Sequence, residues 1–213
     1  MMLIATSWDD GLESDRRLLT ILERHGVRAS FALSPARHCA KAIPNDVRDV
    51  NKYGMLLPLS ELNRYQEHDV CSHTSEHREQ TKIEELQLRL DLYNSKTHLE
   101  DMFKKSIVGV VWPYGCSNST TILHAQQLGY EYGRVTPVKQ RSWQYQKWDI
   151  VPQFWHTPLE DLLRCNFRCL ALSGHTYELR NEKDWEYVER FYQDASQDSR
   201  CNLTTLTELA QTL

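Results

Sequence analysis

The stretch LIATSWDDG, residues 3–11, decides the fold class of this chain. Residues 3–8 form a short apolar run that predicts a buried strand, and the Asp-Asp-Gly that follows is typical of a turn. Downstream, residues 14–25 carry leucines at helical spacing, Gly26 supplies a helix C-cap, and residues 27–33 predict a second strand. The chain therefore opens with a strand, a helix and another strand.

The same alternation of strand and helix continues to the C-terminus. Strands are expected at residues 69–72, 106–111, 132–136, 150–155, 169–173 and near Asn202, and helices at 59–66, 81–103, 119–128, 159–164, 184–192 and the end of the chain. Strands that alternate with helices form parallel βαβ units, so we predict an α/β fold. About seven such units in one chain indicate a single domain over residues 1–213 with a barrel-like closure.

Composition argues against several classes of protein. Lys and Arg total 25 against 29 Asp and Glu, a net charge of −4, which disfavours nucleic acid as a partner. The apolar run at residues 107–112 is too short to span a membrane, and the N-terminal residues do not resemble a signal peptide, so we expect a cytoplasmic protein. The six cysteines include no CxxC pair, which favours reduced thiols over a cysteine zinc cluster. The oligomeric state is not predicted.

Candidate site residues, most of them polar, follow four of the predicted strands, at the edge where parallel α/β folds place their active sites. They are Asp9 and Asp10 after the first strand, His73 and His77 after the strand at 69–72, Trp112, Pro113 and Tyr114 after the strand at 106–111, and His175, Tyr177 and Glu178 after the strand at 169–173. We expect these side chains to converge.

Part of this set has the composition of a metal site. His73 and His77 are four residues apart, so a helical turn beginning there would place both imidazoles on one side. Two imidazoles and one carboxylate make a three-ligand set for zinc or a similar divalent ion and leave one coordination position open. Of the adjacent Asp9 and Asp10, one can bind the metal while the other takes a proton from water. The alternatives are a solvated helix for the histidines and an ordinary turn for the aspartates.

Four motifs of the chain, taken together, point to a known family. They are SWDDG at residues 7–11, SHTSEH at 72–77, WPYG at 112–115 and GHTYE at 174–178. In order and spacing they resemble the polysaccharide deacetylases of carbohydrate esterase family 4, which contain the NodB-homology domain. The resemblance implies a distorted, incomplete (β/α) barrel.

The resemblance also implies the roles of individual residues. The metal ligands are Asp10, His73 and His77, with Zn²⁺ as the expected ion and Co²⁺, Ni²⁺ or Mn²⁺ as alternatives. The general base is Asp9, the backbone N–H of Tyr114 binds the oxyanion, and the general acid is His175.

The implied activity is metal-dependent hydrolysis of an N-acyl amide, acetyl or formyl, on an amino sugar or related carbohydrate. Two alternatives stay open. One is hydrolysis of a non-sugar C–N amide bond on the same fold. The other is a catalytically silent carbohydrate-binding homologue.

The chain departs from the family pattern at two positions. The family has an arginine three residues before the tyrosine, where this chain has Val111, and we expect Arg134 to supply the missing guanidinium; a structural arginine is the alternative. The carboxylate that supports the acid histidine is also indistinct, and Asp149 is the predicted partner of His175. Glu178 is expected to orient His175 or a substrate hydroxyl, or to act only as an acid at a helix N-terminus.

The remaining candidates are expected to contact substrate or support the site. They are Trp112, Pro113 and Tyr177. The aromatic rings could stack on sugar rings, with packing in the core or at its rim as the alternative.

Overall fold

The structure is a computed structural model, and its described residues are 1–39, 53–136, 146–164 and 167–213. The strands are β1 (Met2–Asp9), β2 (Ser30–Leu33), β3 (Asp69–Ser72), β4 (Gly109–Val111), β5 (Tyr132–Arg134), β6 (Gln153–Phe154), β7 (Cys169–Gly174) and β8 (Cys201–Thr204). The α-helices are α1 (Asp15–Arg24), α3 (Glu85–Phe103), α4 (Ser119–Gln127), α5 (Leu159–Arg164), α6 (Glu182–Gln197) and α7 (Leu206–Ala210). Short 3₁₀ turns are η1 (Pro35–His38), η2 (Leu59–Tyr65), η3 (Gln80–Lys82), η4 (Pro113–Gly115) and η5 (Thr176–Glu178).

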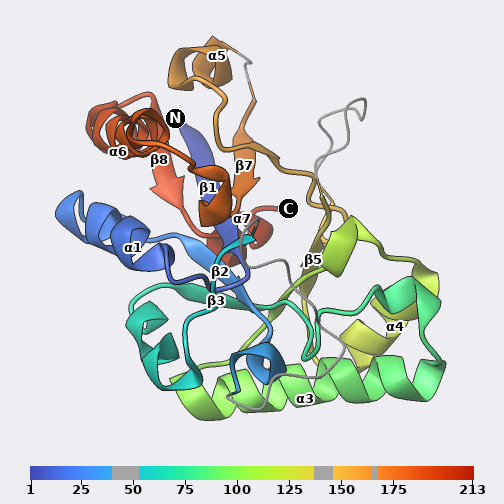
Figure 1. The fold of residues 1–213 in the computed structure, drawn as a ribbon. Helices are drawn as coiled ribbons and strands as arrows, with labels where there is room; N and C mark the ends of the chain where they lie inside the picture. The colour runs from blue at the N-terminus through green and yellow to red at the C-terminus, as the bar shows by residue number, and fades with distance from the viewer. Residues whose placement is uncertain (40–52, 137–145, 165–166) are drawn as a thin grey trace.

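One parallel sheet organises the described residues, with β1 at its centre (Figure 1). Its strand order is β5-β4-β3-β2-β1-β7-β6. One edge of β1 is shared by two strands, since β8 pairs with residues 2–5 and β2 pairs with residues 7–9, while β7 runs along the other edge from residue 3 to residue 8. The sheet is a half-barrel covered by helices, which confirms the predicted incomplete (β/α) barrel.

Side chains alternate along the strands between two apolar clusters. In β1, Ile4 and Trp8 pack in the larger cluster, whereas Ala5 belongs to the smaller one. The same alternation holds in β2, where Phe31 and Leu33 lie in the larger cluster and Ala32 in the smaller. The larger cluster lies between strands and helices, and the smaller one fills the interior of the half-barrel.

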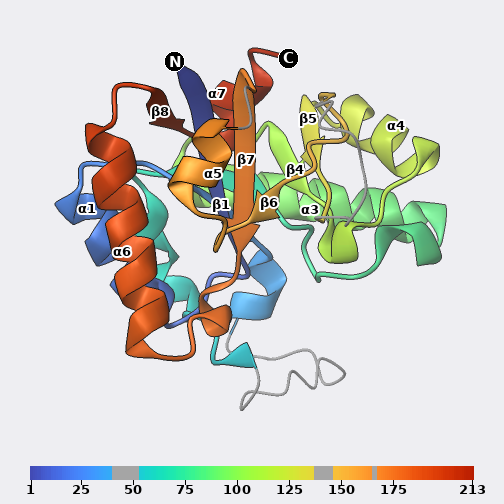
Figure 2. The same ribbon diagram turned by 90° about the horizontal axis from the view of Figure 1, so that it is seen from above.

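Small side chains dominate the interior cluster because α7 takes part of the space. The strand residues there include Ala5, Ala32, Cys71 and Ala171, and α7 adds Leu206, Leu209 and Ala210. Outside the sheet, α1 and α6 lie together on one side and α3 and α4 on the other (Figure 2). The carboxyl ends of the strands are therefore the place where interior-facing polar residues can gather.

Most predicted elements exist, with shifted boundaries. The segment at 59–65 is a 3₁₀ turn, and the long helix expected from residue 81 begins at Glu85, after a 3₁₀ turn. Five cysteines in the described residues are free thiols, and Cys165 lies outside those residues. No helix in the described ranges is long and apolar enough to cross a membrane. The single-domain organisation and the cytoplasmic location stay predictions.

Candidate metal and catalytic site

The two adjacent aspartates diverge at the carboxyl end of β1. Asp9 is the last residue of the strand, and Asp10 has a left-handed backbone with φ 81°. Both side chains are buried. The change of backbone conformation between them sends one carboxylate toward the interior of the half-barrel and the other toward the loop that follows β3.

The histidine loop follows β3, and it contains no helical turn. The structure thus differs from the helical spacing that the sequence suggested for His73 and His77. Instead, Thr74 and His77 adopt left-handed conformations with φ 59° and 57°, and these fold the chain back on itself. The two imidazole rings end 4.6 Å apart, centroid to centroid, and nearly perpendicular.

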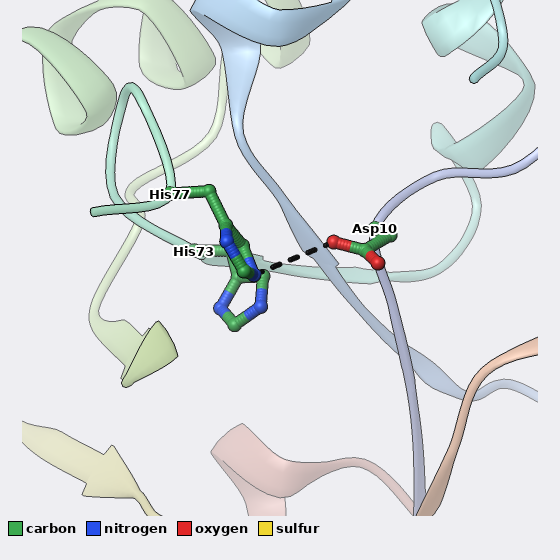
Figure 3. A group of neighbouring side chains, drawn as sticks. All are labelled: Asp10, His73 and His77. Atoms are coloured by element: carbon green, nitrogen blue, oxygen red, sulfur yellow. Dashed lines mark ion pairs between the residues drawn. The ribbon is translucent and has the colours of Figure 1, made fainter. Parts of the chain in front are cut away.

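Asp10, His73 and His77 form one cluster, as Figure 3 shows. One ligand atom from each residue lies within 4.8 Å of the others, and Nε2 of His77 is 3.6 Å from Oδ1 of Asp10. Nδ1 of His73 lies 2.7 Å from the carbonyl oxygen of Val111. Because that nitrogen must donate a proton to the carbonyl, Nε2 is the unprotonated nitrogen and can bind a metal. These residues fit a divalent metal ion.

Both histidines are suited to be neutral ligands. Burial is the main effect that lowers the pKa of His73. Burial and, after it, the neighbouring His73 lower the pKa of His77 to about 3. A neutral imidazole has a lone pair for a metal, whereas an imidazolium has none.

Helix α3 holds the histidine loop from behind. Its Asp91 accepts hydrogen bonds from the backbone N–H of Glu76 at 2.9 Å and from Gln80 at 2.7 Å, and its Ser95 bonds to Ser72 at 2.7 Å. The sequence analysis did not single out these residues. The sequence nevertheless contains a signal for them, because the polar residues Asp91 and Ser95 stand at positions of the buried face of α3 that otherwise hold apolar side chains.

Asp9 is paired with Arg134 in the barrel interior. An Nη2 hydrogen bond joins the guanidinium to Oδ2 of Asp9, and both side chains are almost fully buried. Arg134 pairs in register with Val111 of the neighbouring strand, so the two side chains share a face of the sheet. The predicted contact is therefore present, and it comes from the strand next to the one that carries the arginine in the family.

Charge balance sets the protonation of Asp9. Burial alone would raise its pKa, but Arg134, His73 and His175 outweigh that effect and hold the pKa below its usual value. Oδ1 of Asp9 is buried and has no hydrogen-bond partner among the described residues. An ionised, unshared carboxylate oxygen is the feature that a general base requires.

His175 lies on the other side of Asp9, with a carboxylate at each ring nitrogen. Nε2 is 3.9 Å from Oδ2 of Asp9, and Nδ1 is 3.1 Å from Oε1 of Glu178. Trp155 donates its indole N–H to the second oxygen of Glu178 at 2.7 Å. Glu178, rather than the predicted Asp149, is therefore the carboxylate at Nδ1 of His175. The 3₁₀ turn η5 folds the chain back, so that the Glu178 side chain reaches the imidazole of a residue three positions before it.

The carboxylates around His175 favour its protonated form. Burial would lower its pKa, but the hydrogen bond to Glu178 and the charges of Asp9 and Asp10 raise it above the ordinary value for histidine. A histidine that keeps its proton near neutral pH can act as a general acid.

Tyr114 lies beside the cluster of Asp10, His73 and His77 (the metal-type cluster) and has a strained backbone conformation. Its φ is 58° and its ring centroid is 5.0 Å from that of His77, while 64% of the residue is exposed. Of the five non-glycine residues with positive φ in the described ranges, Asp10, Thr74, His77 and Tyr114 belong to this site. Residues in strained backbone conformations cluster at functional sites, where the surrounding structure holds them in place.

The other candidates divide into buried and accessible residues. Trp112 is 1% exposed and Pro113 is buried, which favours a supporting role by packing over contact with substrate. Tyr177 is half-buried, and its ring lies 4.7 Å from that of His175. Of these three, Tyr177 is the one whose accessible ring lies next to His175.

A half-barrel of parallel strands with a metal-type cluster at their carboxyl ends defines the class of protein, and sequence comparison identifies the family. Residues 2–133, more than half of the chain, match the family model described as polysaccharide deacetylase. The chain belongs to the polysaccharide deacetylase family, a class of hydrolases that act on carbohydrates. A search of curated protein sequences finds no match.

Solved structures with the same fold extend over nearly the whole chain. A family 4 carbohydrate esterase from Streptomyces lividans superimposes with a TM-score of 0.64 at 12% identity, over 99% of this chain and 95% of that one. The Xyl-CE4 domain of a multidomain xylanase from the hindgut metagenome of Trinervitermes trinervoides gives 0.63 at 15% identity, over 99% and 90%. A family 4 carbohydrate esterase from Bacillus anthracis gives 0.60 at 14%, over 99% and 83%. At these identities the likeness is one of fold.

Proposed function

We propose that the chain is a metal-dependent N-deacetylase that hydrolyses the acetyl or formyl amide of an amino sugar or a related carbohydrate. The observation that carries the proposal is the arrangement around Asp9. This buried carboxylate is held by Arg134, lies next to the Asp10, His73 and His77 cluster, and has a histidine on its other side. A carbohydrate-binding protein without activity has no use for this set of charges.

The Asp10, His73 and His77 side chains would hold the metal. One carboxylate and two imidazoles suit Zn²⁺, and Co²⁺, Ni²⁺ or Mn²⁺ as alternatives. When bound, a divalent metal supplies polarisation of the acyl carbonyl and lowers the pKa of water.

The remaining steps belong to the side chains of this protein. Asp9 takes a proton from the attacking water through its unshared Oδ1, while Arg134 keeps the other oxygen fixed. The water oxygen bonds to the acyl carbon, and the backbone N–H of Tyr114 donates to the oxyanion. His175 then protonates the nitrogen as the C–N bond breaks, which leaves a carboxylate and a free amine.

The test separates metal binding from catalysis. The purified protein is analysed for metal content and assayed for amine release from N-acetyl and N-formyl amino sugars. We expect about one equivalent of metal in the parent chain and its loss in an Asp10→Ala, His73→Ala double variant. In Asp9→Asn, metal content should stay while kcat falls by about 10²- to 10⁴-fold.

Two results would contradict the proposal. A parent chain that takes up no metal even on titration would exclude the metal-dependent mechanism and favour the silent homologue. A metal-loaded chain that releases amine only from non-sugar amides would favour the alternative C–N hydrolase.

A further inference from the structure

A buried guanidinium lies against one of the three proposed metal ligands. Arg37, from the turn η1 after β2, places Nη1 3.2 Å from Oδ1 of Asp10. The two side chains are only 6% and 8% exposed, so solvent screens this ion pair weakly. No sequence motif pointed to Arg37.

The oxygen involved is the one that faces the histidine loop. Oδ1 of Asp10 lies 3.2 Å from Arg37 and 3.6 Å from Nε2 of His77. A metal bound by Asp10 and His77 would therefore share the negative charge of this carboxylate with the guanidinium. Two cations at one anionic group repel each other.

The backbone keeps Arg37 in place. Ser34 donates its hydroxyl to the carbonyl of His73 at 2.8 Å, and the backbone N–H of Ala36 donates to the carbonyl of Ser75 at 3.1 Å. The turn that carries Arg37 is thus bonded to the loop that carries both histidines. These contacts hold the backbone of the turn against the histidine loop, so that the Arg37 side chain starts next to Asp10.

We propose that Arg37 is a built-in counter-cation of Asp10, which stabilises the metal-free protein and weakens metal binding. This inference rests on the proposed metal site. By thermodynamic linkage, any preference of Arg37 for the metal-free form must reduce metal affinity by the same factor. The opposite role is a support that only orients the carboxylate, and such supports strengthen metal binding. The sign of the effect distinguishes the two roles.

The experiment removes the charge of Arg37 and keeps a hydrogen-bond donor. Zn²⁺ affinity is measured by chelator competition for the parent chain, Arg37→Gln and Arg37→Lys, together with the melting temperature in EDTA and in excess Zn²⁺. We expect Arg37→Gln to bind Zn²⁺ at least about tenfold more tightly and to melt lower in EDTA, with a larger rise on adding Zn²⁺. Arg37→Lys keeps the charge and should bind Zn²⁺ within about threefold of the parent.

A remote arginine pair supplies the matched control. Arg16 makes a two-point ion pair with Glu61, and both side chains are partly exposed, so Arg16→Gln should leave Zn²⁺ affinity unchanged. Unchanged or weaker Zn²⁺ binding in Arg37→Gln would overturn the inference and leave the proposed function standing. A variant that folds only with Zn²⁺ would support the inference. Absence of Zn²⁺ binding by the parent chain would overturn both.

Discussion

Asp9 is a buried carboxylate whose ionisation depends on the guanidinium of Arg134 and on the neighbouring histidines. Arg134 makes the closest of these contacts, and it comes from a different strand than the family pattern predicts. Val111 and Arg134 pair in register on neighbouring strands. An arginine at position 134 can therefore point into the interior just as an arginine at position 111 would. The same contact gives a prediction about both stability and activity.

Replacing Arg134 with methionine should destabilise the fold and reduce turnover. The change leaves Asp9 buried without its guanidinium, which typically costs about 3–5 kcal/mol of unfolding free energy. It should also raise the pKa of Asp9, because the main cation opposing burial is gone, so the acidic limb of the kcat/KM profile should move to higher pH. Urea unfolding and a pH–rate profile measure these effects, with Arg134→Lys as the charge-preserving control. Intact turnover in the methionine variant would show that Arg134 is structural.

A second residue-scale prediction concerns Glu178 and the acid His175. The Glu178 carboxylate stabilises the imidazolium, so Glu178→Gln should lower the pKa of His175. A group with a raised pKa loses its proton on the alkaline side, and the alkaline limb of the rate profile should therefore move to lower pH. The Asp149→Asn variant is the control and should leave that limb in place. If the two variants behaved alike, Glu178 would not be the partner of His175.

At the scale of elements, the turn η4 presents Tyr114 to the metal-type cluster. Gly115 next to it has φ 68°, and a Cβ there would lie 2.5 Å from the backbone nitrogen of Thr136. Backbone atoms cannot give way as a flexible side chain can. The close approach of Gly115 to Thr136 therefore leaves no room for a side chain in the turn that carries Tyr114.

The Gly115→Ala variant should lose both stability and activity. A left-handed alanine costs about 1–2 kcal/mol by itself, and the clash with Thr136 adds to it. Gly26→Ala is the matched control, because Gly26 has φ 64° with no atom within 4 Å of the added Cβ. We expect denaturant unfolding to show a larger loss for Gly115→Ala, and kcat to fall in that variant alone. Equal losses would mean that Thr136 yields and that the turn is not rigid.

At the scale of the whole molecule, one buried carboxylate joins segments that are far apart in the sequence. Asp15, fully buried at the start of α1, accepts hydrogen bonds from Tyr65 at 2.7 Å, from the backbone of Leu12 at 3.1 Å and from the hydroxyl of Thr176. It thus ties the loop after β1 to the turn after β7, the two segments that carry Asp10 and His175. Burial is the main effect on this carboxyl, and it raises the pKa of Asp15 to about 6.

This raised pKa predicts a pH-dependent stability. The folded form keeps the Asp15 proton to higher pH than the unfolded chain does, so stability falls as pH rises between about 4 and 6. The shift corresponds to about 3 kcal/mol, and the Asp15→Asn variant should lack this slope. Urea unfolding in EDTA from pH 4 to 7.5 measures the difference between the two proteins. Parallel curves would show that Asp15 does not titrate in this range.

Much of the fold was predictable because its signals are local. Apolar runs such as residues 3–8 form strands when other side chains shield them from water. Helices such as Asp15–Arg24 follow from the spacing of their leucines and from a glycine cap. The order of strands and helices then restricts the sheet to parallel connections. For the same reason the four motifs, each beside a strand end, predicted which residues converge.

Tertiary structure decided the partners of those residues. The contact of Asp10 with Arg37 joins residues from separate βα units, and no local pattern specifies it. The contact of Asp9 with Arg134 was expected only as a replacement for the family arginine, and its register is a property of the sheet. The choice of Glu178 over Asp149 depends on a 3₁₀ turn, whose path is set by packing. The sequence by itself determined which elements and motifs exist, because periodicity and turn chemistry act over a few residues. Only the folded sheet determined charge pairing and burial, since these depend on strand register and on which side chains share a face.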